Sequence, residues 1–215
     1  MKMKFRIYVT LAIFGFMTLV LAQEEAINEA MEKDDSKDLM IGQIAPKWAL
    51  KTNPDKINFE FLRKWTVGKD ERLLRPQSQP NRHAVLMSFF ATWCSPCMKE
   101  LPILEEVYKK YKDKQIKFFL IDITEATRGN PGYENMPKAG PFLKEKGVTM
   151  EILYDLRGKV MENYNAQTLP RLFIVDGYQT LRMTRKGFHE GEEEIFKKEL
   201  SEIIDELLAE LPDSE

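Results

Sequence analysis

The stretch that decides the fold reads FFATWCSPCMKELP and spans Phe89–Pro102. It contains Cys94 and Cys97, the two cysteines of this 215-residue chain. The residues before it, Ala84–Phe90, are mostly apolar and predict a buried strand, and apolar residues after the cysteines recur at helical spacing. We therefore expect both cysteines where a strand ends and a helix begins. A helix N-terminus offers unpaired N–H groups and partial positive charge, which favour the reactive thiolate form of cysteine.

Two cysteines this close in sequence can form one short bridge. Such a bridge constrains the unfolded chain little, so a redox role is favoured over a structural one. The alternative is a metal site, but a tetrahedral zinc ion needs two further Cys or His ligands. The two histidines, His83 and His189, do not have metal-ligand spacing. We therefore expect no metal and no cofactor.

Length and charge limit the remaining possibilities. A chain of 215 residues is long enough for one domain with a full core and extensions. The 32 basic and 34 acidic residues nearly balance, and no block of Lys and Arg alternates with aromatic residues. A nucleic-acid partner is therefore not expected.

The N-terminus resembles an export segment. Basic residues at Lys2, Lys4 and Arg6 precede an apolar run, so residues 1–22 are predicted to be a signal peptide or a membrane anchor. Cleavage and retention both remain open, and either places the rest in the periplasm or another extracytoplasmic space. Residues 23–40 are predicted to be a charged linker, and residues 41–212 to be the folded domain.

The rest of the chain predicts alternating strands and helices. A strand is expected at Gln115–Ile123, a loop at Thr124–Tyr133, a helix at Met136–Lys146 and a strand at Met150–Tyr154. Two paired strands, Arg171–Val175 and Leu181–Lys186, should precede a helix at Glu192–Leu211 whose apolar face includes Ile195. Residues 53–82 fit no clear period and are interpreted as an insertion. The order predicts an α/β fold with a mixed sheet and helices on both faces.

The pattern A-T-W-C-x-P-C-x-x-E-x-P, from Ala91 to Pro102, resembles the TlpA/ResA-like thiol–disulfide oxidoreductases of the thioredoxin superfamily. The segment Ile41–Leu50 is similar to the opening of such domains. The resemblance implies a thioredoxin-like fold, with a central mixed β-sheet flanked by helices. It also implies an inserted helix–strand unit between the cysteines and Pro170.

The same resemblance assigns roles to residues. Cys94 is predicted to lie at an exposed tip and to be the attacking thiolate, and Cys97 to resolve the mixed disulfide from beneath it. Trp93 and Pro96 are predicted to shape the contact surface and tune the cysteine pair.

Two further positions are expected to complete the site. The resemblance implies a cis peptide before Pro170, facing the cysteines, with the backbone of Leu169 available to pair with an extended substrate. Glu100 follows Cys97 by three residues, and a glutamate at this place in ResA-like proteins helps to handle protons. A partly buried carboxylate with a raised pKa would suit this role.

The expected function is an exported thiol–disulfide oxidoreductase acting as a monomer. Its relatives reduce disulfides in protein partners, for example in cytochrome c maturation, and receive electrons from a membrane donor. Two alternatives stay open. One is a thiol peroxidase, although the Pro-x-x-x-Thr-x-x-Cys context of such enzymes is missing around Cys94. The other is a non-catalytic thioredoxin-fold binding module.

Overall fold

The computed structural model describes residues 38–72 and 81–211. Contacts divide the chain after Asp38, and the fold below is that of the second unit, Leu39–Glu215, within those described residues. The predicted signal or anchor at 1–22 lies outside the described residues, as does nearly all of the predicted linker at 23–40. No helix in the described part of the chain has both the length and the hydropathy needed to cross a membrane.

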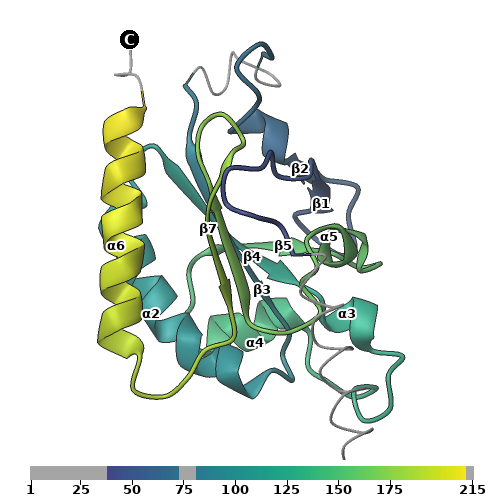
Figure 1. The fold of residues 1–215 in the computed structure, drawn as a ribbon. Coiled ribbons are helices and arrows are strands. Elements are labelled where there is room, and N and C mark those ends of the chain that lie inside the picture. Colours follow the sequence, from purple (N-terminus) through teal and green to yellow (C-terminus); the bar gives the residue numbers. More distant parts are fainter. Residues whose placement is uncertain (1–37, 73–80, 212–215) are drawn as a thin grey trace, which may run out of the picture. The chain divides into compact units, whose positions relative to one another are not determined.

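Among the described residues, seven strands form one mixed sheet with the order β2-β1-β5-β4-β3-β6-β7 (Figure 1). Strands β3, β4 and β5 are parallel, and the strands at both edges pair antiparallel with their neighbours. The strands are β1 Ala49–Lys51, β2 Phe59–Phe61, β3 Ala84–Phe90, β4 Ile116–Asp122, β5 Glu151–Tyr154, β6 Arg171–Val175 and β7 Leu181–Lys186.

Strand β3 lies between β4 and β6, and all seven of its residues are buried. Its register with β4 runs from Ala84 opposite Ile116 to Phe90 opposite Asp122. Strands covered on both faces carry mainly apolar side chains, which explains why β3 and β4 are mostly apolar. The exceptions are Ser88 in β3 and Lys117 and Asp122 in β4. The predicted strand Ala84–Phe90 is confirmed. The cysteines follow its C-terminal end, at the same end of the sheet as the C-terminal ends of β4 and β5.

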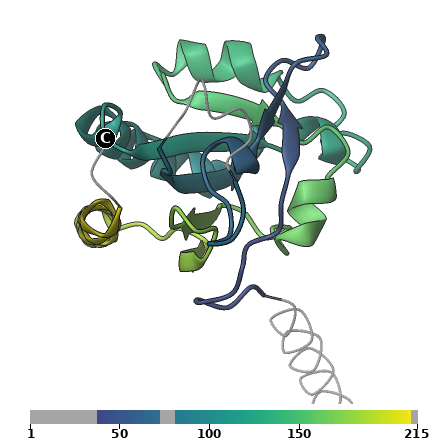
Figure 2. The same ribbon diagram turned by 90° about the horizontal axis from the view of Figure 1, so that it is seen from above.

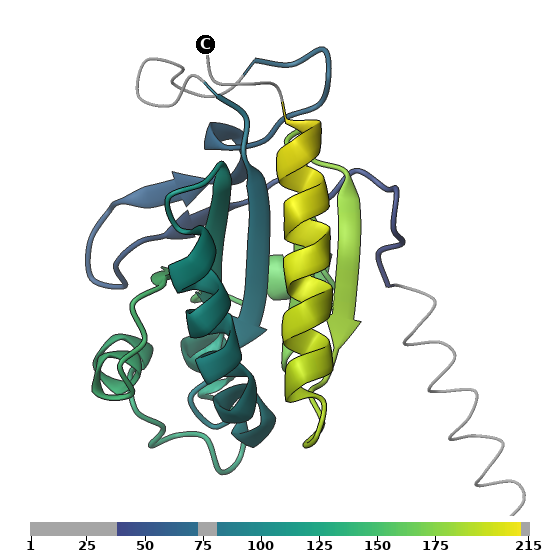
Figure 3. The ribbon, with the colours of Figure 1, turned by 90° about the vertical axis from the view of Figure 1, so that its left-hand side faces the viewer.

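Helices cover both sides of this sheet. Helices α2 (Ser95–Tyr111) and α6 (Glu193–Glu210) lie side by side in Figure 3, and the Tyr111 hydroxyl donates to Asp205 across them at 2.9 Å. In Figure 1 both lie to one side of β7, and α3 (Thr124–Thr127) and α5 (Lys159–Asn163) lie to the other. Helix α6 runs along β7 and is seen end-on in Figure 2. The remaining elements are η1 (Leu62–Lys64) and α4 (Ala139–Glu145).

The insertion between β4 and β5 departs from the prediction in two places. Helix α4 begins at Ala139, not at Met136, because Pro137 disfavours a helical conformation in the residue before it. The predicted loop from Thr124 contains the single turn α3. Just before this turn, the carboxylate of Asp122 accepts a hydrogen bond from the Thr124 amide at 2.9 Å, which satisfies one of the N–H groups left unpaired at a helix start.

The last helix and the 53–82 region also refine the sequence interpretation. In α6, Phe196, Leu200, Ile204 and Leu207 are buried, but Ile195 is 59% exposed. The prediction for Ile195 was wrong because Phe196, about 100° further round the helix, occupies the side that faces the sheet. The 53–82 region supplies β2 and η1, and its residues 73–80 lie outside the described residues.

Candidate active site

The cysteines lie where the sequence places them, at the junction of β3 and α2. Cys94 is the N-cap of α2, and its sulfur accepts a hydrogen bond from the amide of Cys97 at 3.2 Å. Pro96 occupies the first turn, where its missing N–H costs no helical hydrogen bond. Cys94 and Cys97 form a disulfide with an S–S distance of 2.01 Å and a Cα–Cα distance of 5.3 Å.

Both cysteines are buried in this oxidised form. Cys94 is 3% exposed and Cys97 is not exposed. Cys97 therefore lies beneath the surface as predicted, but the expected exposed tip at Cys94 is wrong for this state. The reason is that the bridge turns the sulfur of Cys94 back toward the first turn of α2, so that both sulfurs belong to the hydrophobic core.

Glu100 lies one turn after Cys97 on the same helix and is 2% exposed. The Ser88 hydroxyl, from the middle of β3, donates to the Glu100 Oε2 at 3.0 Å. Burial raises the pKa of Glu100 from 4.5 to about 7, and the Ser88 hydrogen bond and the charge of Arg185 oppose this only in part. A buried carboxyl that titrates near neutrality can accept or release a proton at physiological pH.

Arg185 reaches this region from β7. Ser88 pairs with Leu172 of β6, and Leu172 pairs with Arg185, so the three residues form one row across the sheet. The guanidinium of Arg185 bonds to the carboxylates of Glu192 and Glu199 and lies over the ring of Phe196. Its positive charge is therefore shared with these two carboxylates, which is consistent with its minor effect on Glu100.

The indole of Trp93 is held by the insertion that follows β4. Its Nε1 donates to the Thr127 hydroxyl at 2.9 Å, and its ring stacks on Tyr133 with the centroids 4.3 Å apart and the planes 3° apart. Sequence reasoning missed Thr127 and Tyr133. The available signal was that Tyr133 is the one aromatic residue between Thr124 and Lys138. The insertion therefore fixes the orientation of the side chain next to Cys94.

A second network joins the same insertion to the backbone before Trp93. The Thr92 amide donates to the Thr124 hydroxyl at 3.0 Å, and the Thr124 hydroxyl donates to Asp122 at 2.5 Å. The Thr92 hydroxyl donates to the carbonyl of Pro137 at 3.0 Å. Asp122 is 2% exposed, and burial raises its pKa to about 6 despite the bonds from Thr124.

Leu169 and Pro170 approach the site from the start of β6. Their peptide bond is cis, as the resemblance implied. Arg171, the next residue, pairs with Phe89 near the end of β3, so the Leu169–Pro170 segment lies at the same end of the sheet as the cysteines. The Pro170 carbonyl accepts from the Gly187 amide at 2.8 Å. The structure thus brings the start of β6 to the β3–α2 junction.

The predicted site residues therefore come from two neighbouring places in the fold. Five belong to the β3–α2 junction or the first turns of α2, namely Trp93, Cys94, Pro96, Cys97 and Glu100, and two belong to the segment before β6, namely Leu169 and Pro170. His83 is part of neither group, and its ring lies 5.3 Å from that of Trp65. In the described part of the chain, no cluster of three or more His, Cys, Asp and Glu side chains could hold a metal ion.

Comparisons with known proteins agree with this architecture. The chain is 30% identical over 92 residues to the thiol-disulfide oxidoreductase ResA of Bacillus thuringiensis subsp. konkukian, a match covering 43% of this chain and 48% of ResA. It is 25% identical over 159 residues to ResA of Oceanobacillus iheyensis, covering 74% of this chain and 71% of that protein. The chain thus spans about half the length of the first of these relatives.

Solved structures and a family model complete the comparison. A proposed thiol:disulfide interchange protein, DsbE, from Chlorobium tepidum superposes with a TM-score of 0.57 at 22% identity, covering 78% of this chain and 99% of that one. This likeness shows the thioredoxin-like fold. The family model described as Redoxin matches residues 57–200, which include the cysteines, Glu100 and Pro170. The chain therefore belongs to the Redoxin family, as a ResA-like member of the thioredoxin superfamily.

Proposed function

We propose that this protein is an exported thiol–disulfide oxidoreductase that reduces disulfides in protein partners. The observation that carries the proposal is the Cys94–Cys97 disulfide at the N-terminus of α2, where the Cys94 sulfur accepts the Cys97 amide. The same amide and the helix dipole would stabilise a thiolate at Cys94 after reduction. The ResA relatives are named for this activity.

The reaction transfers two electrons from the dithiol to the partner. The Cys94 thiolate attacks one sulfur of the partner disulfide, and the other partner sulfur leaves as a thiolate. Cys97 then loses its proton and attacks the Cys94 sulfur, which releases the first partner sulfur and forms the Cys94–Cys97 disulfide. A separate reductant must return two electrons, and we propose a membrane donor for this step.

Glu100 is proposed to accept the proton of Cys97 in the second step. It lies one helical turn from Cys97, on the same face of α2. It is buried, so no bulk solvent competes for the proton, and its pKa of about 7 matches the task at neutral pH. The Ser88 hydroxyl would hold the ionised carboxylate by donating a hydrogen bond to it.

The partner is proposed to bind across Trp93, Pro96, Leu169 and Pro170. Trp93 is held by its stacking on Tyr133, so the surface beside Cys94 is preorganised. Among the described residues, none forms a hydrogen bond with the backbone of Leu169. Its N–H and C=O are therefore available to pair with an extended segment of the partner, as a strand pairs with a sheet edge.

The first prediction separates the roles of the two cysteines. Cys94→Ala removes the attacking sulfur and should lower the rate of insulin reduction by dithiothreitol to the rate without the protein. Cys97→Ala removes only the resolving sulfur and should leave the partner attached at Cys94 as a mixed disulfide, visible by mass spectrometry. Insulin reduction by the Cys94 variant at a rate above this background would contradict the assignment. Consumption of hydrogen peroxide at a rate exceeding disulfide reduction would instead favour the thiol peroxidase.

The second prediction concerns the direction of electron flow. A protein that reduces its partners should have a reduction potential close to that of thioredoxin, about −270 mV. Equilibration with glutathione or dithiothreitol at known ratios, followed by quantification of the two redox states, measures it. A potential near that of a strong oxidant, about −120 mV, would show that the protein works in the oxidising direction.

The third prediction tests Glu100 through pH. In the wild type, the rate at which Cys97 releases thionitrobenzoate from a mixed disulfide at Cys94 should rise with pH through about 7, because only ionised Glu100 accepts the proton. Glu100→Gln should slow this release roughly tenfold at pH 7.5. The increase of the rate with pH near pH 7 should also be absent in this variant. Glu106→Gln, an exposed position on the same helix, is the matched control.

A stability measurement checks the same group independently. The pKa of Glu100 is higher in the folded protein than in the unfolded chain. The contribution of this group to the unfolding free energy is therefore fully present below about pH 4.5 and is lost as pH rises through about 7. Relative to Glu100→Gln, the wild type should lose about 3 kcal/mol of unfolding free energy over this range, at about 1.4 kcal/mol for each pH unit. If the unfolding free energies of the two proteins, measured by urea denaturation, change with pH in parallel, the raised pKa is refuted.

A further inference from the structure

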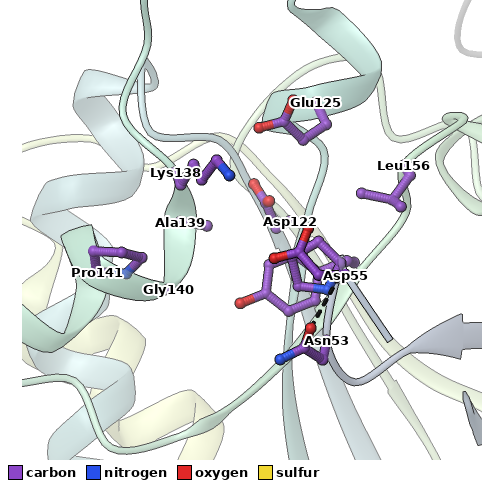
Figure 4. A pocket seen from close by; sticks show the side chains of 11 residues that line it. Asn53, Asp55, Asp122, Glu125, Lys138, Ala139, Gly140, Pro141 and Leu156 are labelled. Carbon is purple, nitrogen blue, oxygen red and sulfur yellow. Dashed lines mark hydrogen bonds between the residues drawn. The ribbon is translucent and has the colours of Figure 1, made fainter. Parts of the chain in front are cut away.

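A cavity of about 650 Å³ opens beside the active-site junction, at the edge where β4 and β5 end (Figure 4). Binding sites in sheets with parallel strands commonly lie at this edge, and the volume is that of a ligand site. Its walls come from the β1–β2 turn, the end of β4, α3, the start of α4 and the end of β5. They are formed by Asn53, Pro54, Asp55, Asp122, Glu125, Lys138, Ala139, Gly140, Pro141, Tyr154 and Leu156.

Asp122 supplies a buried acceptor to this cavity. Its Oδ1 accepts hydrogen bonds from both the amide and the hydroxyl of Thr124. No donor among the described residues bonds to its Oδ2, although Asp122 is only 2% exposed and lines the cavity. This Oδ2 is not one of the fully enclosed unpaired side-chain atoms of the described residues, so a donor inside the cavity can reach it. A donor brought by a ligand would therefore be favoured at this position.

The charges around Asp122 favour a cation. Figure 4 shows the carboxyl groups of Asp122 and Glu125 and the amine of Lys138 turned toward a common space. Arg128 already binds both oxygens of Glu125, at 2.6 and 2.8 Å. This leaves Asp122 and the exposed Asp55 against the exposed Lys138. The net charge that a ligand meets in the cavity is therefore negative, and the buried charged group is the carboxylate of Asp122.

The other walls suit an aliphatic chain. Pro54, Ala139, Pro141 and Leu156 contribute apolar surface, and Gly140 has no side chain to fill the space in front of the Tyr154 hydroxyl, which lies 3.0 Å from its ideal Cβ position. An apolar wall with an acidic floor matches lysine and arginine side chains. These bury their methylene groups and place their charge on a polar partner.

The cavity is also joined to the active site. Thr124 links Asp122 to the amide of Thr92, which lies two residues before Cys94. The Thr92 hydroxyl binds the carbonyl of Pro137, next to Lys138 in the wall of the cavity. A group bound at Asp122 therefore lies two hydrogen bonds from the backbone of the cysteine loop.

We propose that this cavity binds a lysine or arginine side chain of the protein whose disulfide is exchanged at Cys94. The inference rests on the proposed function and adds to it a substrate preference. Its prediction is that a basic residue at a suitable distance from the substrate disulfide accelerates the reaction, because Asp122 and Asp55 receive the cationic group while the disulfide lies at Cys94.

The test uses short peptides with one internal disulfide, in pairs that differ only in arginine or its neutral isostere citrulline at one flanking position. The position is moved through the flanks on both sides. The reduced full-length protein is mixed with each peptide, and the second-order rate constant of Cys94–Cys97 oxidation is measured. At one or more positions, arginine should react about tenfold faster than citrulline, as expected for a hydrogen-bonded charge pair.

Variants locate this preference in the cavity. Asp55→Asn, on the exposed β1–β2 turn, and Asp122→Asn should each reduce the arginine-to-citrulline ratio to about threefold or less. Lys138→Gln removes the competing positive charge and should increase the ratio. Asp113→Asn is the control, since Asp113 lies between α2 and β4, at the opposite end of β4 from Asp122, and it should leave the ratio unchanged.

Two outcomes would overturn the inference and differ from each other. If arginine and citrulline peptides are reduced at equal rates at every position, or if the preference survives in both Asp55→Asn and Asp122→Asn, the cavity does not bind the basic side chain. The proposed function would then stand. If no peptide disulfide is reduced at all, the proposed function fails, and the substrate preference fails with it.

Discussion

The hydrogen bond from the Cys97 amide to the Cys94 sulfur is the interaction on which the site depends. It satisfies one of the unpaired N–H groups at the start of α2 with a sulfur instead of the usual hydroxyl or carboxylate. The helix therefore starts where the chain leaves β3, and the same geometry directs positive potential at the reacting atom. Folding and reactivity consequently share one contact, which explains why so short a segment carries both.

Glu100 is the group that we propose to accept the proton of Cys97. Its carboxyl lies between α2 and the sheet, where it accepts a hydrogen bond from the Ser88 hydroxyl of β3. Burial raises its pKa to about 7, and this lowers the unfolding free energy as pH rises toward that value. The insertion after β4 acts on the other side of the cysteines, where Thr124, Thr127 and Tyr133 fix Thr92 and Trp93. The loop that carries Thr92 and Trp93 thus lies between the proposed proton acceptor Glu100 and the cavity at Asp122.

Local patterns predicted the elements with strong periodicity. The mostly apolar run of β3 and the cysteine spacing at the start of α2 predicted the strand, the helix and their junction correctly. Boundaries failed where a single residue decides them, as Pro137 does for α4. The contacts of Tyr133 with Trp93 and of Ser88 with Glu100 join separate segments, so no local period reveals them. The same holds for the cavity at Asp122, whose walls come from five elements.

The most direct test of the account is the alkylation rate of each cysteine in the reduced protein as a function of pH, using Cys97→Ala and Cys94→Ala to separate the two sulfurs. The account predicts that Cys94 reacts rapidly, with a half-maximal rate below about pH 7.5, and that Cys97 reacts slowly until the protein is unfolded. Equal rates for both sulfurs, with half-maximal reaction near the ordinary cysteine value of about 8.5, would contradict it.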